Sequence, residues 1–186
     1  KIVWMPTRDS KNSLSFGDME GDFFKRPGIS IYNEKGKIKD SVYEVLEVVK
    51  KYNAYIATGH LNAEEAIHLC KEARKLNINT ILTHPDWVRT IIPLEIQLEL
   101  ARSGVLIEKV WANIVEGTIT AEEMALSINK MGPENVFMVT DRGQAQKESP
   151  IEGMLSFIQC ILDQGIKKED IRKMLSIVPE MILGIQ

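Results

Sequence analysis

Two short apolar runs that each end in a histidine constrain the fold of this chain more than any other feature. The first run ends at His60 and the second at His84, 24 positions later. Between them, residues 62–76 carry apolar residues at helical spacing, after an Asn-Ala-Glu-Glu start that is typical of a helix N-terminus. A strand, a helix and a strand in so few residues predict a βαβ unit with parallel strands. Both histidines are therefore expected at the carboxyl edge of one sheet, where α/β folds carry their chemistry.

The same alternation of strands and helices continues along the chain. Besides the strand that ends at His60, strands are predicted at residues 2–5, 79–83, 105–110 and 135–140. Helices are predicted from a cap at Asp40, over 62–76, from Pro93 to near Gly104, and over 120–131, 150–164 and 168–177, with a tail at 179–184. Strict alternation predicts an α/β fold with a parallel sheet covered by helices.

Residues 10–38 interrupt this pattern near the N-terminus. The stretch 6–28 is rich in glycine and proline and contains Phe16, Phe23 and Phe24. A long loop of this kind is usually a functional lid or a disordered segment, and the aromatic residues favour a lid that packs. A hairpin with Gly36 at its turn is predicted to follow. We therefore expect 10–38 to be a lid and hairpin insertion.

Composition excludes several classes of protein. A chain of 186 residues suits one domain. Its net charge of −3, without a long basic cluster, argues against a nucleic-acid partner. No apolar stretch approaches the roughly 20 residues of a membrane helix, and no G-x-G-x-x-G or Walker A loop occurs. Cys70 and Cys160 are far apart, which favours packed thiols in a reduced, cytoplasmic protein.

Polar residues recur at the predicted strand ends, namely His60, His84, Glu108 and Asp141. Two neutral imidazoles and a carboxylate suit zinc or a similar divalent ion, which lowers the pKa of a bound water. In the simpler alternative, these residues cap helices or satisfy buried backbone groups. Glu108 could face either side of its strand; a position at the mouth is favoured, and Lys109 beside it could then be its surface-side neighbour.

Several runs resemble the amidohydrolase superfamily of metal-dependent hydrolases, and more closely one uncharacterised branch of it. The matching runs are 3–7, 57–61, 83–85, 139–144 and 179–184. The resemblance implies a TIM-like (β/α)₈ barrel with metal ligands at its strand ends. His60 and His84 match the single histidines of strands 5 and 6. Asp141 matches the strand-8 aspartate, which binds metal and takes a proton from the attacking water.

The sequence departs from this family pattern in three places. The H-x-H pair of strand 1 is missing, so 1–186 is expected to be the C-terminal five-strand part of the barrel, lacking about three βα units and inactive alone. No bridging lysine or glutamate follows Met5, which favours one metal ion over two, although Asp9 or Glu108 could replace it. Relatives in this branch often have a histidine where Ser13 stands.

Together these features predict a metal-dependent hydrolase of amide, ester, lactone or related bonds in a small molecule. Zinc is the expected cofactor, held by His60, His84, Asp141 and Glu108, with Asp141 as the general base. Trp87, Trp111, Gln144 and Asp9 are expected to border the substrate. The alternative is a catalytically inactive barrel that binds a small molecule or serves as a scaffold. No membrane partner is expected, and the formation of a homo-oligomer is left open.

Overall fold

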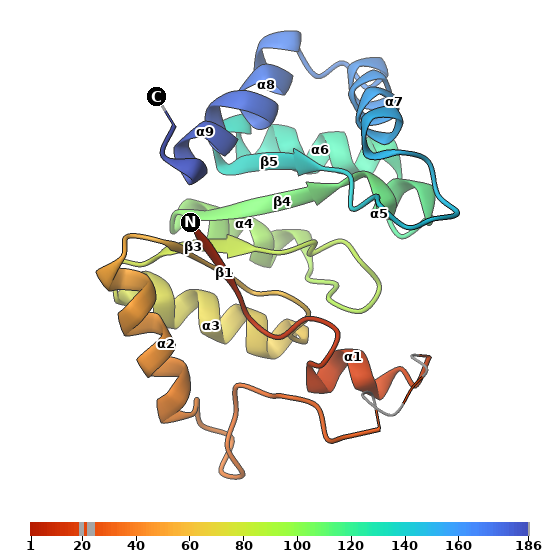
Figure 1. The fold of residues 1–186 in the computed structure, drawn as a ribbon. Helices are drawn as coiled ribbons and strands as arrows, with labels where there is room; N and C mark the ends of the chain where they lie inside the picture. The colour runs from red at the N-terminus through yellow and green to blue at the C-terminus, as the bar shows by residue number, and fades with distance from the viewer. Residues whose placement is uncertain (19–20, 22–24, 186) are drawn as a thin grey trace.

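The computed structural model of this protein describes residues 1–18, 21 and 25–185. It is an α/β fold with one five-stranded parallel sheet flanked by helices (Figure 1). The strands are β1 (Ile2–Trp4), β2 (Tyr55–Ala57), β3 (Asn79–Leu82), β4 (Val105–Val110) and β5 (Val136–Val139). They lie side by side in sequence order, and every neighbouring pair is parallel. The predicted alternation and the parallel sheet are therefore confirmed.

Helices connect the strands; most of them pack on one face of the sheet, and the last one packs on the other. They are α1 (Lys11–Ser15), α2 (Asp40–Lys51), α3 (Ala63–Lys75), α4 (Leu94–Arg102), α5 (Trp111–Val115), α6 (Ala121–Met131), α7 (Pro150–Asp163), α8 (Lys168–Arg172) and α9 (Val178–Leu183). A 3-10 turn, Pro133–Asn135, precedes β5, and a π-helical segment, Lys173–Ile177, joins α8 to α9. The C-terminal tail is thus helical, with Pro179 in the first turn of α9.

Side-chain caps define where several helices begin. Asn62, Thr120 and Ser149 each form a capping box with the glutamate three residues later. These reciprocal hydrogen bonds satisfy backbone N–H groups that have no partner inside the helix. The predicted cap at Asp40 is wrong by one residue, because Lys39 is the N-cap and Asp40 lies in the first turn of α2. There its carboxylate faces the positive end of the helix dipole.

The predicted lid and hairpin differ from expectation in their secondary structure. The short helix α1 lies within the predicted loop, capped by the hydroxyl of Ser10. The hairpin is reduced to a single antiparallel bridge between Tyr32 and Ile38. Gly36 lies in the turn at φ +71°, a conformation that glycine adopts without strain. Phe23 and Phe24, expected to help pack the lid, lie outside the described residues.

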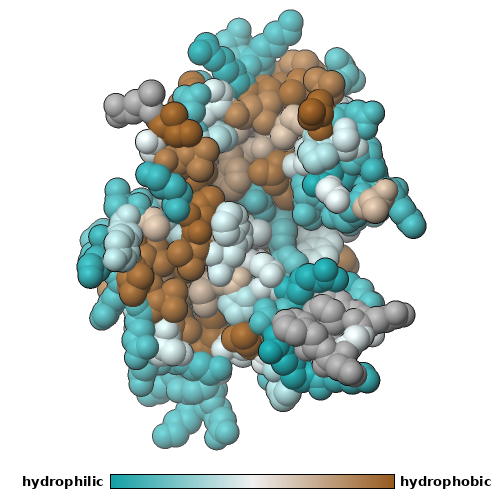
Figure 2. Space-filling model, in the orientation of Figure 1, coloured by the Kyte–Doolittle hydropathy of each residue, from teal (hydrophilic) through white to brown (hydrophobic). Residues whose placement is uncertain are grey.

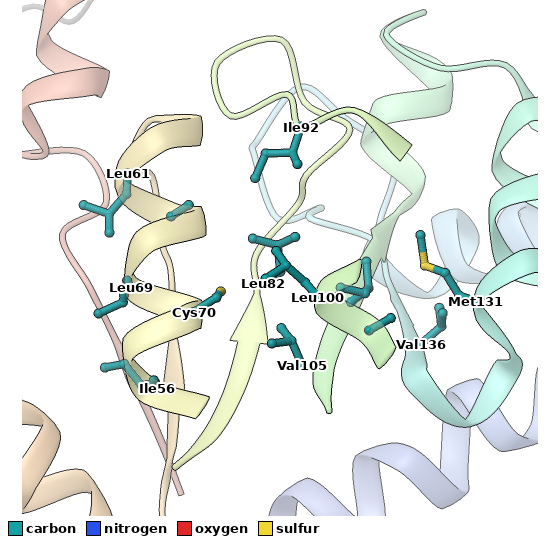
Figure 3. Packing of buried hydrophobic residues seen from close by; sticks show 14 of the residues in the cluster. Ile56, Leu61, Leu69, Cys70, Leu82, Ile92, Leu100, Val105, Met131 and Val136 are labelled. Carbon is teal, nitrogen blue, oxygen red and sulfur yellow. The ribbon is translucent and has the colours of Figure 1, made fainter. Parts of the chain in front are cut away.

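The main hydrophobic core lies between the sheet and the helices. Alternate strand residues such as Ile56, Leu82 and Val105 point to this side and are almost fully buried. Leu69 and Cys70 of α3 meet them across the layer (Figure 3). Burial of each large apolar side chain contributes about 1.5–3 kcal/mol. This packing makes the helix-facing side of the sheet the rigid support for the strand ends.

The opposite face of the sheet carries a second, smaller apolar cluster. It contains Tyr55, Ala57, Ile81, Leu106 and Phe137, with Val178 and Ile182 of α9 packed over them. Ile2 of β1 and Val139 of β5 both pack against this cluster, so it extends to both edge strands. Trp4 is nevertheless 52% exposed. Figure 2 shows hydrophobic side chains gathered on this side of the molecule, from α9 past β1 to α2.

Cys70 is fully buried and Cys160 is partly buried, and neither forms a disulfide. Burial raises the pKa of the Cys70 thiol to about 12, which makes it a packing group rather than a nucleophile. Over residues 1–18, 21 and 25–185, the helices are too short or too polar to cross a membrane.

Candidate functional site

A pocket of about 290 Å³ lies at the carboxyl edge of the sheet. Its walls come from all five strand ends, including both edge strands. The lining residues are Trp4, Thr7, His60, Thr83, His84, Glu108, Val139 and Asp141. The structure therefore brings together the four strand-end residues that the sequence predicts to share one site.

Unusual backbone conformations mark the ends of three of these strands. Gly59 has φ +59°, and a Cβ built on it would lie 2.4 Å from the carbonyl oxygen of Met5. His84 has φ +28° and Asp141 has φ +51°, a region that residues other than glycine rarely occupy. Such conformations cost of the order of 1–3 kcal/mol each and cluster at functional sites. The strain here falls on two of the predicted ligands.

His60 is held by the segment that begins α1. Its carbonyl oxygen accepts hydrogen bonds from Ser10 Oγ at 2.9 Å and from Asn12 Nδ2 at 3.1 Å. Its ring atom Nδ1 lies 3.0 Å from Ser13 Oγ. Burial, with the nearby charges of Arg89 and Arg8, lowers the pKa of His60 to about 4. The imidazole is therefore neutral at pH 7, and the start of the predicted lid segment supports this residue.

His84 is fixed more tightly. Its backbone N–H donates to Glu108 Oε2 at 2.8 Å, and its ring atom Nδ1 lies 3.0 Å from Thr90 Oγ1. Burial, followed by the neighbouring His60, lowers the pKa of His84 to about 3. The ring centroids of His60 and His84 are 4.9 Å apart. Two neutral imidazoles therefore lie side by side at the pocket.

The two carboxyl groups of the pocket lie where their negative charge is disfavoured. Burial, with the charge of Asp141 adding to it, raises the pKa of Glu108 to about 7, although the His84 N–H opposes the rise. Burial and Glu116 also raise the pKa of Asp141, against the opposing charge of Arg142. Both shifts indicate carboxyl groups with too little positive charge nearby.

The pocket fits a divalent cation in the chemistry of its donors. Neutral imidazoles and carboxylates are the ligands that zinc prefers, and a cation would stabilise the ionised forms of Glu108 and Asp141. As the side chains stand, no three histidine, cysteine, aspartate or glutamate residues in the described part of the chain are close enough together to hold a metal ion.

The four residues that were expected to border the substrate differ in where they lie relative to the pocket. Trp87 packs edge-on against His60 and His84, with ring centroids 5.1 and 5.0 Å away. Trp111 lies outside the pocket lining, because it begins α5 and turns to Phe157 and to Glu148, which accepts from its Nε1 at 2.7 Å.

Gln144 and Asp9 do not line the pocket either. Gln144 is exposed, and its side chain donates to the backbone oxygen of Asp141 at 3.2 Å. Asp9 pairs with Arg26 at 3.4 Å, close to the segment before α1. Trp4 and Thr7 line the pocket instead. Their position on either side of Met5-Pro6, where the first strand ends, is the sequence signal that could have identified them.

A buried polar network on the other side of β4 was not predicted from the sequence. Lys109 is fully buried, and its Nζ donates to Asp86 Oδ2 at 2.7 Å and to Gln97 Oε1 at 3.0 Å. Gln97 Nε2 in turn donates to Asp86 Oδ1 at 2.9 Å. Lys109 does point away from Glu108, but toward the helices rather than to the surface. The network braces the segment that follows His84.

The fold and its pocket define a parallel α/β protein with a polar site at the carboxyl edge of its sheet. The chain belongs to a family of unknown function, DUF6282, whose model matches residues 1–108. It is similar in fold to the apo crystal structure of Agrobacterium tumefaciens ATU3138, with 13% sequence identity and a TM-score of 0.53. That similarity covers 100% of this chain and 70% of the other. No match was found among curated proteins.

Proposed function

We propose that this chain forms the C-terminal five-strand part of a TIM-like (β/α)₈ barrel in a metal-dependent hydrolase of the amidohydrolase type. Five parallel strands in sequence order, connected by helices, are what such a part requires. The lining of the pocket supports the proposal, since Trp4 of β1 and Val139 of β5, from the two edge strands, contribute to the same pocket. In a barrel, β1 and β5 would be strands 4 and 8.

The observation that carries the proposal is the convergence, at one pocket, of two neutral histidines and two carboxyl groups whose pKa values are raised. His60 and His84 would hold a single zinc ion through the ring nitrogen that faces away from Ser13 and Thr90. Asp141 would be the third ligand, with Glu108 beside it. A bound zinc ion would supply a water molecule activated as a nucleophile at neutral pH.

The residues of the chain would orient the reacting groups and accept the proton that the reaction releases. Asp141 would accept the proton of the attacking water as the carboxylate that follows the end of β5. Trp87 would keep both imidazole rings in place by packing against their edges. The volume and the lining of the pocket, with Trp4 and Val139 opposite the polar groups, suit a small-molecule substrate with an apolar part.

Metal analysis of the purified full-length protein tests the proposal. We expect about one zinc ion per chain in wild-type protein and loss of this zinc in the double variant His60→Gln/His84→Gln. The matched control is His68→Gln, because His68 lies on α3, where its Nδ1 contacts the hydroxyl of Tyr32 at 3.0 Å, outside the pocket. Wild-type protein that purifies without a transition metal and binds none on addition would refute the hydrolase. It would favour a catalytically inactive barrel.

A further inference from the structure

The hydroxyl group of Thr90 lies between two atoms of His84. Thr90 is buried, at 3% exposure, in the segment between β3 and α4. Its Oγ1 lies 2.8 Å from the carbonyl oxygen of His84 and 3.0 Å from His84 Nδ1. One side chain therefore contacts both the backbone and the ring of a residue that lines the pocket.

The two contacts together determine which ring nitrogen of His84 carries hydrogen. A hydroxyl group has a single hydrogen atom, and a carbonyl oxygen can only accept. The hydrogen of Thr90 is therefore used at the carbonyl oxygen of His84, so Thr90 Oγ1 must accept from Nδ1. A neutral imidazole carries one hydrogen, and with Nδ1 protonated its Nε2 bears the lone pair.

We propose that Thr90 is a positioning residue that fixes His84 in the Nδ1–H tautomer and leaves Nε2 as an electron-pair donor at the pocket. The tautomer follows from the hydrogen bonds alone. The use of Nε2 as a metal ligand rests on the proposed function. A hydrogen bond to the second ring nitrogen orients a histidine ligand and raises its basicity.

The backbone around His84 reinforces this arrangement. Its N–H is bound by Glu108, and its carbonyl oxygen also accepts from the backbone N–H of Trp87 at 3.1 Å. These contacts hold the residue at φ +28°, where it would otherwise relax. Rotation of the imidazole would break the Thr90 contact in this buried setting. The ring is therefore pre-set before any ligand arrives.

His60 provides an internal comparison. Its Nδ1 also contacts a hydroxyl, that of Ser13, at 3.0 Å. Among the described residues the Ser13 hydroxyl has no second hydrogen-bond partner, so it can either donate to this nitrogen or accept from it. The geometry therefore fixes the tautomer of His84 and leaves that of His60 open. Variants at Thr90 and Ser13 should differ accordingly.

Nitrogen NMR of the imidazole rings tests the proposal in metal-free full-length protein. In wild type we expect His84 with a protonated Nδ1 and an unprotonated Nε2. Thr90→Val keeps the shape of the side chain and removes the hydroxyl, so the ring should shift toward the Nε2–H form or a mixture. Thr90→Ser should restore the wild-type pattern, and Ser13→Ala should leave the signals of His84 unchanged. An Nε2–H tautomer in wild type, or a Thr90→Val spectrum identical to wild type, would overturn the proposal.

Zinc titration separates this inference from the proposed function. Removal of a hydrogen bond behind a metal ligand typically weakens metal affinity 10–100-fold, so Thr90→Val should raise the zinc Kd by about that factor and Thr90→Ser should recover it. If wild type shows the expected tautomer but binds no zinc, the hydrolase proposal fails and the role of Thr90 stands. If Thr90→Val does not fold, the wild-type and Thr90→Ser spectra decide the matter.

Discussion

Glu108 and Lys109 are neighbours on β4, yet their charges lie in different surroundings on the two sides of the sheet. Lys109 faces the helices, where burial lowers its pKa and the carboxylate of Asp86 opposes that shift at 2.7 Å. Glu108 faces the pocket, where burial raises its pKa and Asp141 adds to the rise. The charge of Lys109 is matched by a partner within the fold, whereas Glu108 has no positive partner among the residues that the structure describes. The helix-facing side therefore contributes to stability, and the unmatched charge on the pocket side is the basis of the proposed cation site.

The largest effect is expected on the pocket side, at Asp141. Asp141→Asn should keep the fold and lower turnover about 10²–10⁴-fold, because an amide can hydrogen-bond but cannot accept the proton. The rate would be measured in full-length protein on a substrate identified by screening amides, esters and lactones. Asp163→Asn, on the exposed surface of α7, is the matched control and should retain activity. Wild-type turnover by Asp141→Asn would assign the general base to another residue.

A somewhat smaller effect, on stability, is expected on the helix-facing side. Lys109→Met leaves the buried carboxylate of Asp86 without its cation, which should cost about 3–5 kcal/mol in the free energy of unfolding. The control is Lys71→Met, because Lys71 pairs with Glu99 at 2.9 Å on the exposed surface. Such exposed pairs contribute about 0–1 kcal/mol. Equal losses in the two variants by urea denaturation would contradict a structural role for the buried network.

A still smaller effect, on the pH dependence of stability, is expected for Glu108→Gln. It would sharpen the contrast between the two sides of the sheet. In metal-free folded protein the pKa of Glu108 is about 7, above its ordinary value of 4.5. The folded state therefore binds more protons between these values, so the stability contributed by Glu108 falls as pH rises and is lost above pH 7. Glutamine does not titrate at this position.

The stability of Glu108→Gln relative to wild type should thus increase by up to about 1.4 kcal/mol per pH unit between about pH 4.5 and 7, and then level off. Titration of the two histidines acts in the opposite direction, but it is common to both proteins. Denaturation curves at a series of pH values would measure the difference. A stability difference that stays constant over this pH range would show that the surroundings of Glu108 do not raise its pKa.

The sequence predicted most of the sheet and the convergence of its strand ends. The capping boxes at Asn62, Thr120 and Ser149 are local signals, since each donor and acceptor lie three residues apart. Strand ends at His60 and His84 could be predicted because parallel strands in a βαβ unit share one edge. Local chemistry and topology together were sufficient for these features.

Features that depend on distant contacts could not be predicted. Lys109 meets Asp86 and Gln97 only after α4 has packed against β4, and its sequence neighbours give no sign of such partners. Trp111 is directed away from the pocket because α5 begins immediately at the end of β4. Similarly, α1 was hidden within a glycine-rich stretch, and its stability depends on hydrogen bonds from Ser10 and Asn12 to His60. Tertiary packing decided each of these outcomes.

The most direct test of the central claim is diffraction from crystals of full-length protein with zinc, with data collected at the zinc absorption edge. The account predicts one anomalous peak at the carboxyl edge of the sheet, about 2.0–2.1 Å from Nε2 of His84 and from a ring nitrogen of His60. Asp141 should provide an oxygen ligand to the same ion. A zinc ion held elsewhere, such as at His68, with the pocket lacking an anomalous peak, would contradict the account.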